Sequence, residues 1–491
     1  MEQYILALDA GTTSSRSILF DRKGHIAGMA QIELTPCFPQ SGWVEHDPIE
    51  IYNTQLKTIH QVMDNTGIRA SQIAGIGITN QRETTILWNK KTGKPIGNAI
   101  VWQDRRTKDI CDDMKSHESV FKEKTGLVLD PYFSGTKIHW LLQSDPKVKK
   151  QAEAGDLLFG TVDSWLVWHL SGGEDHITDI TNASRTLLFN IHTLQWDTEL
   201  LEILGIPQCI LPRVVSCSEK LSQTTPSLFG ESIPISGIAG DQQAALFGQL
   251  CFEKGDIKNT YGTGCFCIIN TGNQALKSSS GMLTTIGYQI DGNVHYAIEG
   301  SVFTAGALIQ WLRDQLGIID TSHQIEALAN TVSDNGGITF IPALSGLATP
   351  YWNPDVRGAL MGITRGTQKG HIARAALEAI ALRTYDIVSE MQKELQRPIG
   401  SLKVDGRVSN NDLLMQIQSD LIQAKVIRPK TTETTALGAA FLSGLSVGFW
   451  KSKDELIDIW EVDQTFHPNK SNHSQPLIQQ WQSNISRVLS P

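Results

Sequence analysis

The feature that most constrains the fold is a strand–turn–strand pattern near the start of each half of the chain. From Tyr4 to Phe20, β-branched and aromatic residues flank the small polar run AGTTSS, which is typical of a hairpin with a polar tip. Near Lys254 the pattern restarts, because DIKNTYGTGCFCIIN again sets a Gly/Thr turn beside an apolar run. The recurrence predicts two halves, each carrying its own Gly/Thr turn.

The length agrees with two halves. At 491 residues the chain is too long for one hydrophobic core and long enough for two domains. Strand and helix patterns alternate through about residue 250, and a clear helical period follows over residues 371–395. We therefore predict an α/β fold with a first half at 1–250, a second half at 251–491 and a cleft between them.

Composition excludes several classes of function. The 42 basic and 51 acidic residues give a net charge of −9, so we expect neither a nucleic acid nor an anionic membrane as partner. Seven scattered cysteines lack Cys-x-x-Cys spacing, which predicts reduced thiols rather than disulfides or a zinc site. The N-terminus lacks signal-peptide features, and no segment approaches the roughly 20 apolar residues that span a bilayer. We expect a cytoplasmic protein.

Polar segments that adjoin apolar strands are candidates for phosphate chemistry. In ALDAGTTSSR, Asp9 leaves a strand and could hold Mg²⁺ through water, while the loop offers N–H groups and hydroxyls to phosphate. Arg16 could add charge, and a polar hairpin tip without a ligand is the alternative. Asp241 follows a glycine after an apolar strand, where it could accept a hydroxyl proton or merely cap the next helix. NTYGTGCF supplies the second turn, so the two turns together could hold the β- and γ-phosphates.

The order of these motifs resembles the FGGY family of carbohydrate kinases, whose members share the actin-like (ribonuclease H-like) ATPase fold. YFSGTKIHWL, from Tyr132 to Leu141, matches the first signature of the family. GALMGITRGTQKGHIARAALE, from Gly358 to Glu378, matches the second, and nearly the whole chain is covered. The resemblance implies two actin-like domains and phosphoryl transfer from ATP with Mg²⁺.

Six further segments resemble the members of the family that phosphorylate glycerol and differ from the sugar kinases. They are GITNQRETT, IVWQDRRT, LVLDPYFSGTK, FGTVDSWL, TNASRTLLFNI and AGDQQAALFGQ. The resemblance implies that ATP phosphorylates glycerol to sn-glycerol 3-phosphate, and that the chain forms a homo-oligomer, either a dimer or a tetramer. A buried triol needs every hydroxyl paired and an apolar wall beside its carbon chain.

The resemblance also implies roles for individual residues. Asp241 would be the general base, Asp9 the carboxylate on the metal side, and both would lie beside Mg²⁺. The acceptor site would comprise Arg82, Glu83, Trp102, Tyr132, Asp241, Gln242 and Phe266. The nucleotide site would comprise Thr12, Thr13, Ser14, Arg16, Thr263, Gly306, Gln310, Arg407 and Asn411.

Two positions depart from the pattern of the family. The usual Asp-Gly-Gly reads VDGRVSNN, so Arg407 stands where a positive φ or a close phosphate would make a side chain costly. We expect crowding that an outward rotamer partly relieves, whereas a guanidinium that binds phosphate is the alternative. Asn353 replaces an acid in GLATPYWNP, and we expect a smaller effect there.

Two other functions are compatible with these motifs. A kinase for a pentulose or for gluconate would need polar groups other than Arg82 and Glu83. A catalytically silent, nucleotide-sensing protein is suggested by Arg407, but Asp9 and Asp241 are both present and argue against it.

Overall fold

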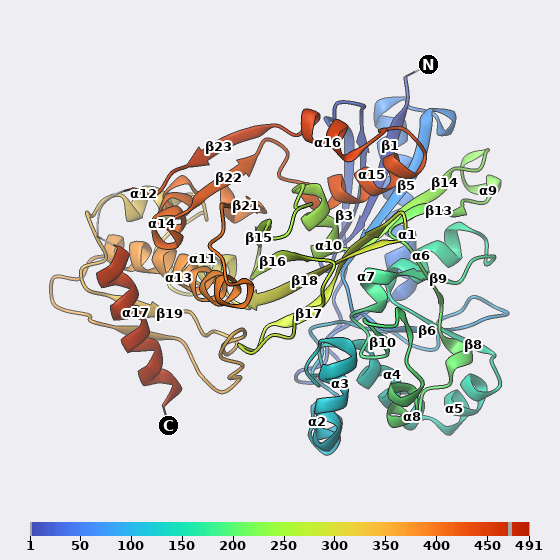
Figure 1. Ribbon diagram of the computed structural model, residues 1–491, viewed down its shortest axis with the longest axis horizontal. Coiled ribbons are helices and arrows are strands. Elements are labelled where there is room, and N and C mark those ends of the chain that lie inside the picture. The colour runs from blue at the N-terminus through green and yellow to red at the C-terminus, as the bar shows by residue number, and fades with distance from the viewer. Residues whose placement is uncertain (1, 470–473, 491) are drawn as a thin grey trace.

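The computed structural model describes residues 2–469 and 474–490, and the two halves of the chain lie side by side in it (Figure 1). Within these residues, thirteen strands form one continuous sheet. From edge to edge they are β3 (Ile26–Glu33), β2 (Ser14–Phe20), β1 (Tyr4–Ala10), β5 (Ile73–Asn80), β14 (Pro234–Gly240), β13 (Ser218–Gln223), β17 (Leu283–Ile290), β18 (Asn293–Val302), β16 (Cys265–Gly272), β15 (Ile257–Tyr261), β21 (Ser401–Asp405), β22 (Lys425–Pro429) and β23 (Val462–Phe466).

The same strand pairing occurs in both halves. In the first half, β1 pairs antiparallel with β2 and parallel with β5, and β5 pairs parallel with β14. In the second half, β15 pairs antiparallel with β16 and parallel with β21, and β21 pairs parallel with β22. The predicted α/β architecture and the restart of the pattern near Lys254 are therefore confirmed, while the domain limits 1–250 and 251–491 stay predictions.

Helices cover the sheet, and short strands pair outside it. Helices of the first half are α1 (Pro48–Thr66), α2 (Lys108–Asp113), α3 (Glu118–Thr125), α4 (Ser134–Ser144), α5 (Pro146–Glu153), α6 (Val162–Leu170), α7 (Ile180–Ala183), α8 (Thr198–Leu204), α9 (Pro226–Phe229) and α10 (Asp241–Gly248). Those of the second half are α11 (Gly306–Asp314), α12 (Gln324–Ala329), α13 (Lys369–Leu395), α14 (Asp412–Ile422), α15 (Thr434–Ser446), α16 (Lys453–Ile459) and α17 (Ser474–Leu489). The short pairs are β4 (Glu45–His46) with β7 (Ala99–Ile100), β6 (Ile86–Asn89) with β8 (Leu157–Gly160), β9 (Ile177–Asp179) with β12 (Arg213–Val215), β10 (Phe189–Asn190) with β11 (Gln195–Trp196), and β19 (Thr339–Ile341) with β20 (Ala359–Met361).

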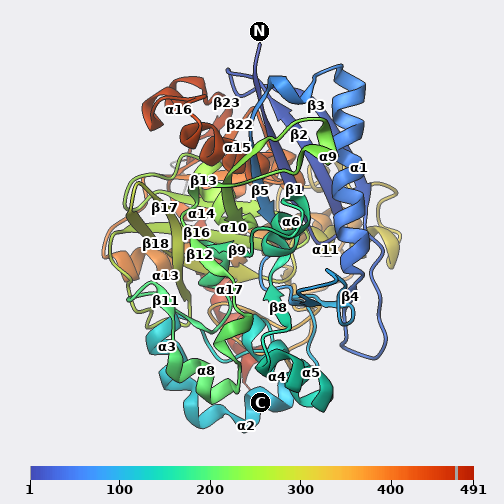
Figure 2. The ribbon, with the colours of Figure 1, turned by 90° about the vertical axis from the view of Figure 1, so that its right-hand side faces the viewer.

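Helices α1 and α15 cover opposite faces of the first-half strands (Figure 2). Alternate residues of a strand point to opposite faces, so the apolar run of β1 supplies two cores. Ile5 and Ala7 pack in the core that contains α15, while Leu6 and Leu8 pack in the core that contains α1. Asp9 follows these residues and ends the apolar run at the edge of both cores.

Helix α15 belongs to the second half in sequence but packs against β5 and β14 of the first. It also crosses α10 at a very short separation, because glycines lie at the crossing. A Cβ atom on Gly438 would lie 1.8 Å from the Ala244 carbonyl oxygen, and one on Gly248 would lie 2.0 Å from that of Thr434. Helix α15, which is rich in small residues, is therefore tightly packed inside the protein.

Two other expectations about the chain can be compared with the structure. All seven cysteines are free, as their spacing predicts. Across residues 2–469 and 474–490, no helix has both the length and the apolar character needed to cross a membrane.

The packing of α10 on α15 predicts that Gly438→Ala is strongly destabilising. The added methyl group would overlap a backbone oxygen that cannot move independently, and overpacking of this kind costs about 1–3 kcal/mol or more. Urea unfolding would measure the loss. Gly97→Ala is the matched control, because nothing lies within 4 Å of its Cβ position. Equal stabilities for the two variants would contradict this account of the crossing.

Candidate active site

Three parallel strands end together and bring the candidate residues of the first half to one place. In the register of the sheet, Asp9 of β1 lies opposite Thr79 of β5, and Asn80 of β5 lies opposite Gly240 of β14. Arg82 therefore follows β5 at the same edge where Asp241 begins α10. The carboxyl ends of parallel strands are the usual place for the catalytic groups of α/β proteins.

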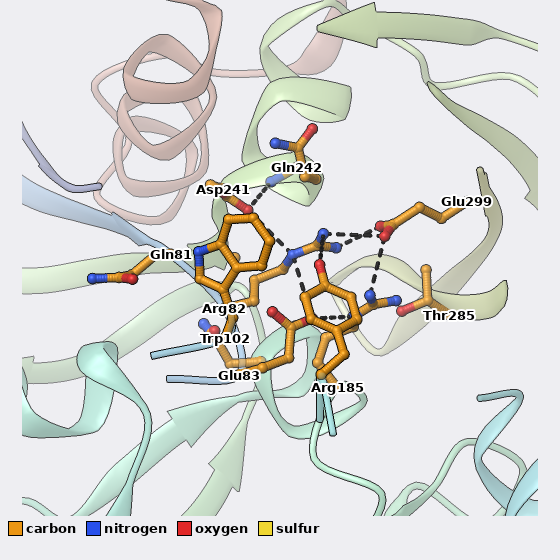
Figure 3. A network of polar contacts seen from close by, with 12 residues as sticks. Gln81, Arg82, Glu83, Trp102, Arg185, Asp241, Gln242, Thr285 and Glu299 are labelled. Carbon is orange, nitrogen blue, oxygen red and sulfur yellow. Dashed lines mark hydrogen bonds and ion pairs between the residues drawn. The ribbon is translucent and has the colours of Figure 1, made fainter. Parts of the chain in front are cut away.

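Arg82 is the centre of the polar cluster at this edge (Figure 3). Its side chain is buried, and its Nε lies 3.2 Å from Asp241 Oδ1. Nη2 donates to the hydroxyl of Tyr132 at 3.5 Å, and Nη1 lies 2.5 Å from Glu299 Oε2. The structure thus brings together Arg82, Tyr132 and Asp241, which lie far apart in sequence, and adds a glutamate from the second half.

A second buried arginine completes the cluster. Arg185 Nε donates to Glu83 Oε1 at 2.7 Å, and its Nη2 donates to Glu299 Oε1 at 3.0 Å. Glu299 therefore accepts from both arginines, while Glu83 accepts from Arg185 and lies 3.9 Å from Arg82 Nε. Two cations and two anions balance one another out of contact with water. We refer to Arg82, Glu83, Arg185 and Glu299 as the ion network.

The network shifts the pKa values of its carboxyl groups in different directions. Burial alone would raise the pKa of Glu299, but Arg185 and Arg82 outweigh it and lower that pKa to about 2. Burial raises the pKa of Glu83, although Arg82 and Arg185 oppose the rise. Of the two carboxyl groups in the ion network, Glu299 is thus the one that is more firmly held in its ionised form.

The backbone at Glu83 is itself unusual. Its φ of 61° lies in the left-handed region, which a side chain disfavours by about 1–3 kcal/mol. The conformation is held by the ion pair to Arg185 and by Ser134 Oγ, which donates to the Glu83 carbonyl oxygen at 2.9 Å. Backbone strain of this kind persists only where the surrounding contacts hold the residue in place, and it is common at functional sites.

Aromatic rings form a wall beside the polar cluster. The ring of Trp102 lies edge-on to Tyr132, with 5.6 Å between centroids, and edge-on to Phe266 of the second half at 6.4 Å. Trp102 Nε1 donates to Thr12 Oγ1 at 2.9 Å. This hydrogen bond joins the wall to the first Gly/Thr turn, so the predicted acceptor and phosphate residues are neighbours.

Asp9 and Arg16 flank that first turn. Arg16 pairs with Asp9 and with Glu433, which lies just before α15. Burial raises the pKa of Asp9, Arg16 opposes that rise and Glu433 adds to it. Ser14 is buried at the start of β2, whereas Thr13 is exposed at the tip of the turn.

The second Gly/Thr turn is joined to the start of α11 by backbone hydrogen bonds. The Gly306 N–H donates to the Gly262 carbonyl at 3.0 Å, and the Ala307 N–H donates to that of Thr263 at 3.1 Å. A Cβ on Gly306 would lie 2.6 Å from the Gly262 oxygen, so only glycine fits. Thr263 and Gln310 both remain exposed.

Arg407 departs from the expectation of a strained backbone. The positive φ in this loop falls on Gly406, at 83°, and a Cβ there would lie 2.4 Å from the Tyr261 oxygen. Arg407 begins the short turn of 3₁₀ helix Arg407–Asn410, is exposed, and does not share the positive φ. A positive φ at this position is therefore ruled out. The expected crowding of Arg407 and its place beside the nucleotide stay predictions.

Asn411 has a structural task in the same loop. Its side-chain oxygen accepts from the Leu414 N–H at 2.8 Å and caps α14. The NH₂ group of Asn411 is then the part of its side chain that is available to a ligand.

The predicted metal position consists of two carboxylates rather than a full cage. Among the described residues, no group of three or more His, Cys, Asp or Glu side chains is placed to hold a metal ion. Burial raises the pKa of Asp241, with Arg82 opposing the rise and Asp9 adding to it. The two carboxylates are therefore close enough to repel each other, and a divalent cation between them would relieve that repulsion.

Sequence reasoning missed three buried charged residues. Arg185 lies in the segment TNASRTLLFNI, Glu299 lies in β18, and Lys258 lies in β15, and all three are fully buried. The only signal in the sequence is a charged residue within an otherwise apolar run, as in YAIEGSV and DIKNTY. That pattern is also typical of a strand with one face in water, so it did not single them out.

Comparison with known proteins agrees with this geometry. Residues 4–248 match the N-terminal domain of the FGGY family of carbohydrate kinases, and residues 257–447 match its C-terminal domain. Glycerol kinase of Deinococcus radiodurans is 55% identical over 488 residues, which are 99% of this chain and 97% of that protein. Glycerol kinase of Oleidesulfovibrio alaskensis is 53% identical over 490 residues, with 99% of each covered. The structure of Plasmodium falciparum glycerol kinase with ADP matches with a TM-score of 0.94 at 35% identity, covering 100% of this chain and 99% of that one, and confirms the predicted actin-like fold.

The ion network predicts that Glu299→Gln destabilises the fold. The change leaves two buried arginines with one carboxylate, and removing one partner of a buried ion pair costs about 3–5 kcal/mol. The folded pKa of about 2 lies below the ordinary value of 4.5, so the contribution of Glu299 is complete above pH 4.5 and declines toward pH 2.

Urea unfolding of wild type and Glu299→Gln across that pH range measures both effects. The difference in unfolding free energy should be largest near neutral pH and should shrink as the pH falls below 4.5. Glu231→Gln, at an exposed site, is the matched control and should cost little at any pH. A difference that grew on acidification would contradict the assignment.

The position of Arg407 predicts that Arg407→Gly does not tighten nucleotide binding. Since no backbone strain exists to be relieved, we expect the KM for ATP to stay within about twofold of wild type, as for most exposed sites. Steady-state kinetics at saturating acceptor would measure it. A fall of several-fold would indicate crowding after all, and a rise of tenfold would indicate a contact between the guanidinium and a phosphate.

Proposed function

We propose that this chain, which belongs to the FGGY family of carbohydrate kinases, transfers the γ-phosphoryl group of ATP to a terminal hydroxyl of glycerol. The product would be sn-glycerol 3-phosphate. The observation that carries the proposal is the grouping of Arg82, Glu83, Tyr132 and Asp241 beside the Trp102 ring. The two relatives at 55% and 53% identity, both named glycerol kinase, support the same acceptor.

The cluster offers what a small triol requires. Arg82 supplies N–H donors, Glu83 and Asp241 supply acceptor oxygens, and the Tyr132 hydroxyl can do either. The rings of Trp102 and Phe266 would cover the carbon chain. Because each buried polar group needs a partner, a site of this kind rejects analogues that lack a hydroxyl by a factor of roughly 10⁴.

Asp241 would act as the general base. Its carboxylate is partly exposed, and Arg82 Nε lies 3.2 Å from Oδ1, which fixes the direction of the group. The Gln242 N–H also donates to Oδ1, at 2.7 Å. The attacking hydroxyl would transfer its proton to the carboxylate as its oxygen bonds to phosphorus. Burial raises the pKa of Asp241, which brings the group closer to the range suited to proton transfer.

The phosphates of ATP would lie between the two Gly/Thr turns. Thr12 and Thr13 belong to the first turn, Ser14 and Arg16 follow it in β2, and Thr263 belongs to the second turn. Gly306, Gln310, Arg407 and Asn411 would border the rest of the nucleotide, because the second turn is bonded to α11 and a Cβ on Gly306 would lie 3.0 Å from Val408. Phosphoryl transfer depends mainly on positioning and charge neutralisation, which these groups can supply without a covalent intermediate.

Mg²⁺ fits beside Asp9 and Asp241. Mg²⁺ prefers oxygen ligands and is commonly held by one or two carboxylates together with substrate phosphates. When bound, the ion would neutralise phosphate charge. Asp9 would hold it from the end of β1, where Arg16 keeps the carboxylate in place.

We also propose that the enzyme works in the cytoplasm as a homo-oligomer, either a dimer or a tetramer. Light scattering coupled to size-exclusion chromatography would test the oligomer, since one chain has a mass of 54.1 kDa.

The proposed activity is tested by a coupled assay for ADP release with glycerol and Mg·ATP. Activity with glycerol, and far lower kcat/KM with 1,2-propanediol, xylulose or gluconate, is the expected result. Activity confined to a pentulose or gluconate would contradict the acceptor. No turnover of any of the four, by protein that binds ATP, would favour a nucleotide-sensing protein instead.

The proton-transfer role predicts that Asp241→Asn lowers kcat by about 10²-fold or more, because an amide cannot accept the proton. Glycerol binding should be partly retained, since the amide oxygen can still accept a hydrogen bond. Calorimetric titration with glycerol would separate binding from turnover. Asp64→Asn, at an exposed site on α1, is the matched control. An Asp241→Asn enzyme that kept most of its kcat would remove Asp241 from the base role.

A further inference from the structure

Lys258 is a fully buried lysine at the meeting of the two halves. It lies in β15, and its Nζ donates to Gln242 Oε1 at 2.5 Å and to Thr260 Oγ1 at 2.8 Å. Lysine is almost never fully buried without a specific partner, because its ammonium loses strong hydration. Both partners here are neutral oxygens, so the burial is not explained by a simple ion pair.

The charges around Lys258 come from four separate elements. Burial lowers the pKa of Lys258, and Asp405 at the end of β21 opposes that most strongly. Asp241 at the start of α10 and Glu299 in β18 also oppose it, whereas Arg82 adds to the lowering. The lysine therefore lies among three carboxylates and beside the ion network.

The hydrogen bond to Gln242 fixes the orientation of that side chain. An ammonium group has three donors and no acceptor, so the carboxamide of Gln242 must turn its oxygen toward Lys258. Its NH₂ group is then the end left to face another acceptor. The backbone of Gln242 is held as well, because its N–H donates to Asp241 Oδ1. The NH₂ group of Gln242 is therefore the end of its side chain that is turned away from Lys258 and available to donate to a ligand.

We propose that Lys258 is a positioning residue for the acceptor, which holds Gln242 so that its amide NH₂ donates to a substrate hydroxyl oxygen. The inference rests on the proposed function, because that function places Gln242 in the acceptor site. It extends the site to the second half, since β15 supplies Lys258 and α10 supplies Gln242.

The test compares Lys258→Met with the matched control Lys403→Met. Methionine fills a similar apolar volume without the ammonium. Lys403 lies directly opposite Lys258 in the register of β15 and β21, and donates to the backbone carbonyls of Gln249 and Leu250. We expect Lys258→Met to raise the KM for glycerol about tenfold, as for a lost hydrogen bond, with the KM for ATP changed less than about twofold. Lys403→Met should change neither.

A second variant keeps the inference testable if Lys258→Met does not fold. Gln242→Glu keeps an oxygen for Lys258 but removes the donor that faces the acceptor, so it should fold and should also raise the KM for glycerol. In the Gln242→Glu background, Lys258→Met should then add little to the loss in glycerol KM, because both changes remove the same donor.

The outcomes separate the two proposals. Wild-type protein that fails to phosphorylate glycerol would overturn the function itself. Active wild type with an unchanged glycerol KM in both variants would overturn only the role of Lys258. Equal rises in the KM values for glycerol and ATP would assign Lys258 a merely structural role and would also overturn the inference.

Discussion

Two arginines, Arg82 and Arg185, are buried at the meeting of the two halves, and the first half of the chain supplies only one carboxylate, Glu83, that is buried as deeply. A buried guanidinium without a counter-ion is costly, so Arg82 and Arg185 need carboxylates that are equally buried. Glu83 supplies one, but it pairs closely only with Arg185. The other is Glu299, which comes from β18 and contacts both arginines. The ion network is therefore complete only when the two halves are docked.

Several other contacts also join the two halves of the chain. Helix α15 returns to the first half and packs on α10, which begins with Asp241, and glycines at the crossing allow the backbones to touch. Phe266 closes the aromatic wall from the second half, and Lys258 reaches Gln242 from the same side. If Asp241 is the base, as proposed, an ordered helix start keeps it in position, so packing far from the reacting atoms would contribute to the chemistry. The first half would then supply the base, and the second half would fix its surroundings.

Local sequence patterns were sufficient to predict the helices and strands, but they were not sufficient to predict the ion network. Asp9 and Asp241 could be proposed as site residues because each acid lies beside glycine at the end of an apolar strand, although a polar hairpin tip or a helix cap fits the same pattern. Arg185, Glu299 and Lys258 could not, since their partners are distant in sequence and are brought to them only by the tertiary fold. Arg407 is a different case. The family pattern, which has glycine at this position, suggested a positive φ there. In the structure, the positive φ and the close approach to the Tyr261 oxygen both occur at Gly406. Pairwise geometry across the sheet decides such cases, and a single sequence does not contain it.

The central claim is that the ion network presents Arg82, Glu83 and Asp241 to one small polyol. A crystal structure with glycerol, Mg²⁺ and a non-hydrolysable ATP analogue tests it most directly. The account predicts a terminal hydroxyl of glycerol about 2.6–3.2 Å from the Asp241 carboxylate, with the other hydroxyls on Arg82 and Glu83. Glycerol bound away from Asp241, or a cleft in which Glu299 no longer contacts the two arginines, would contradict it.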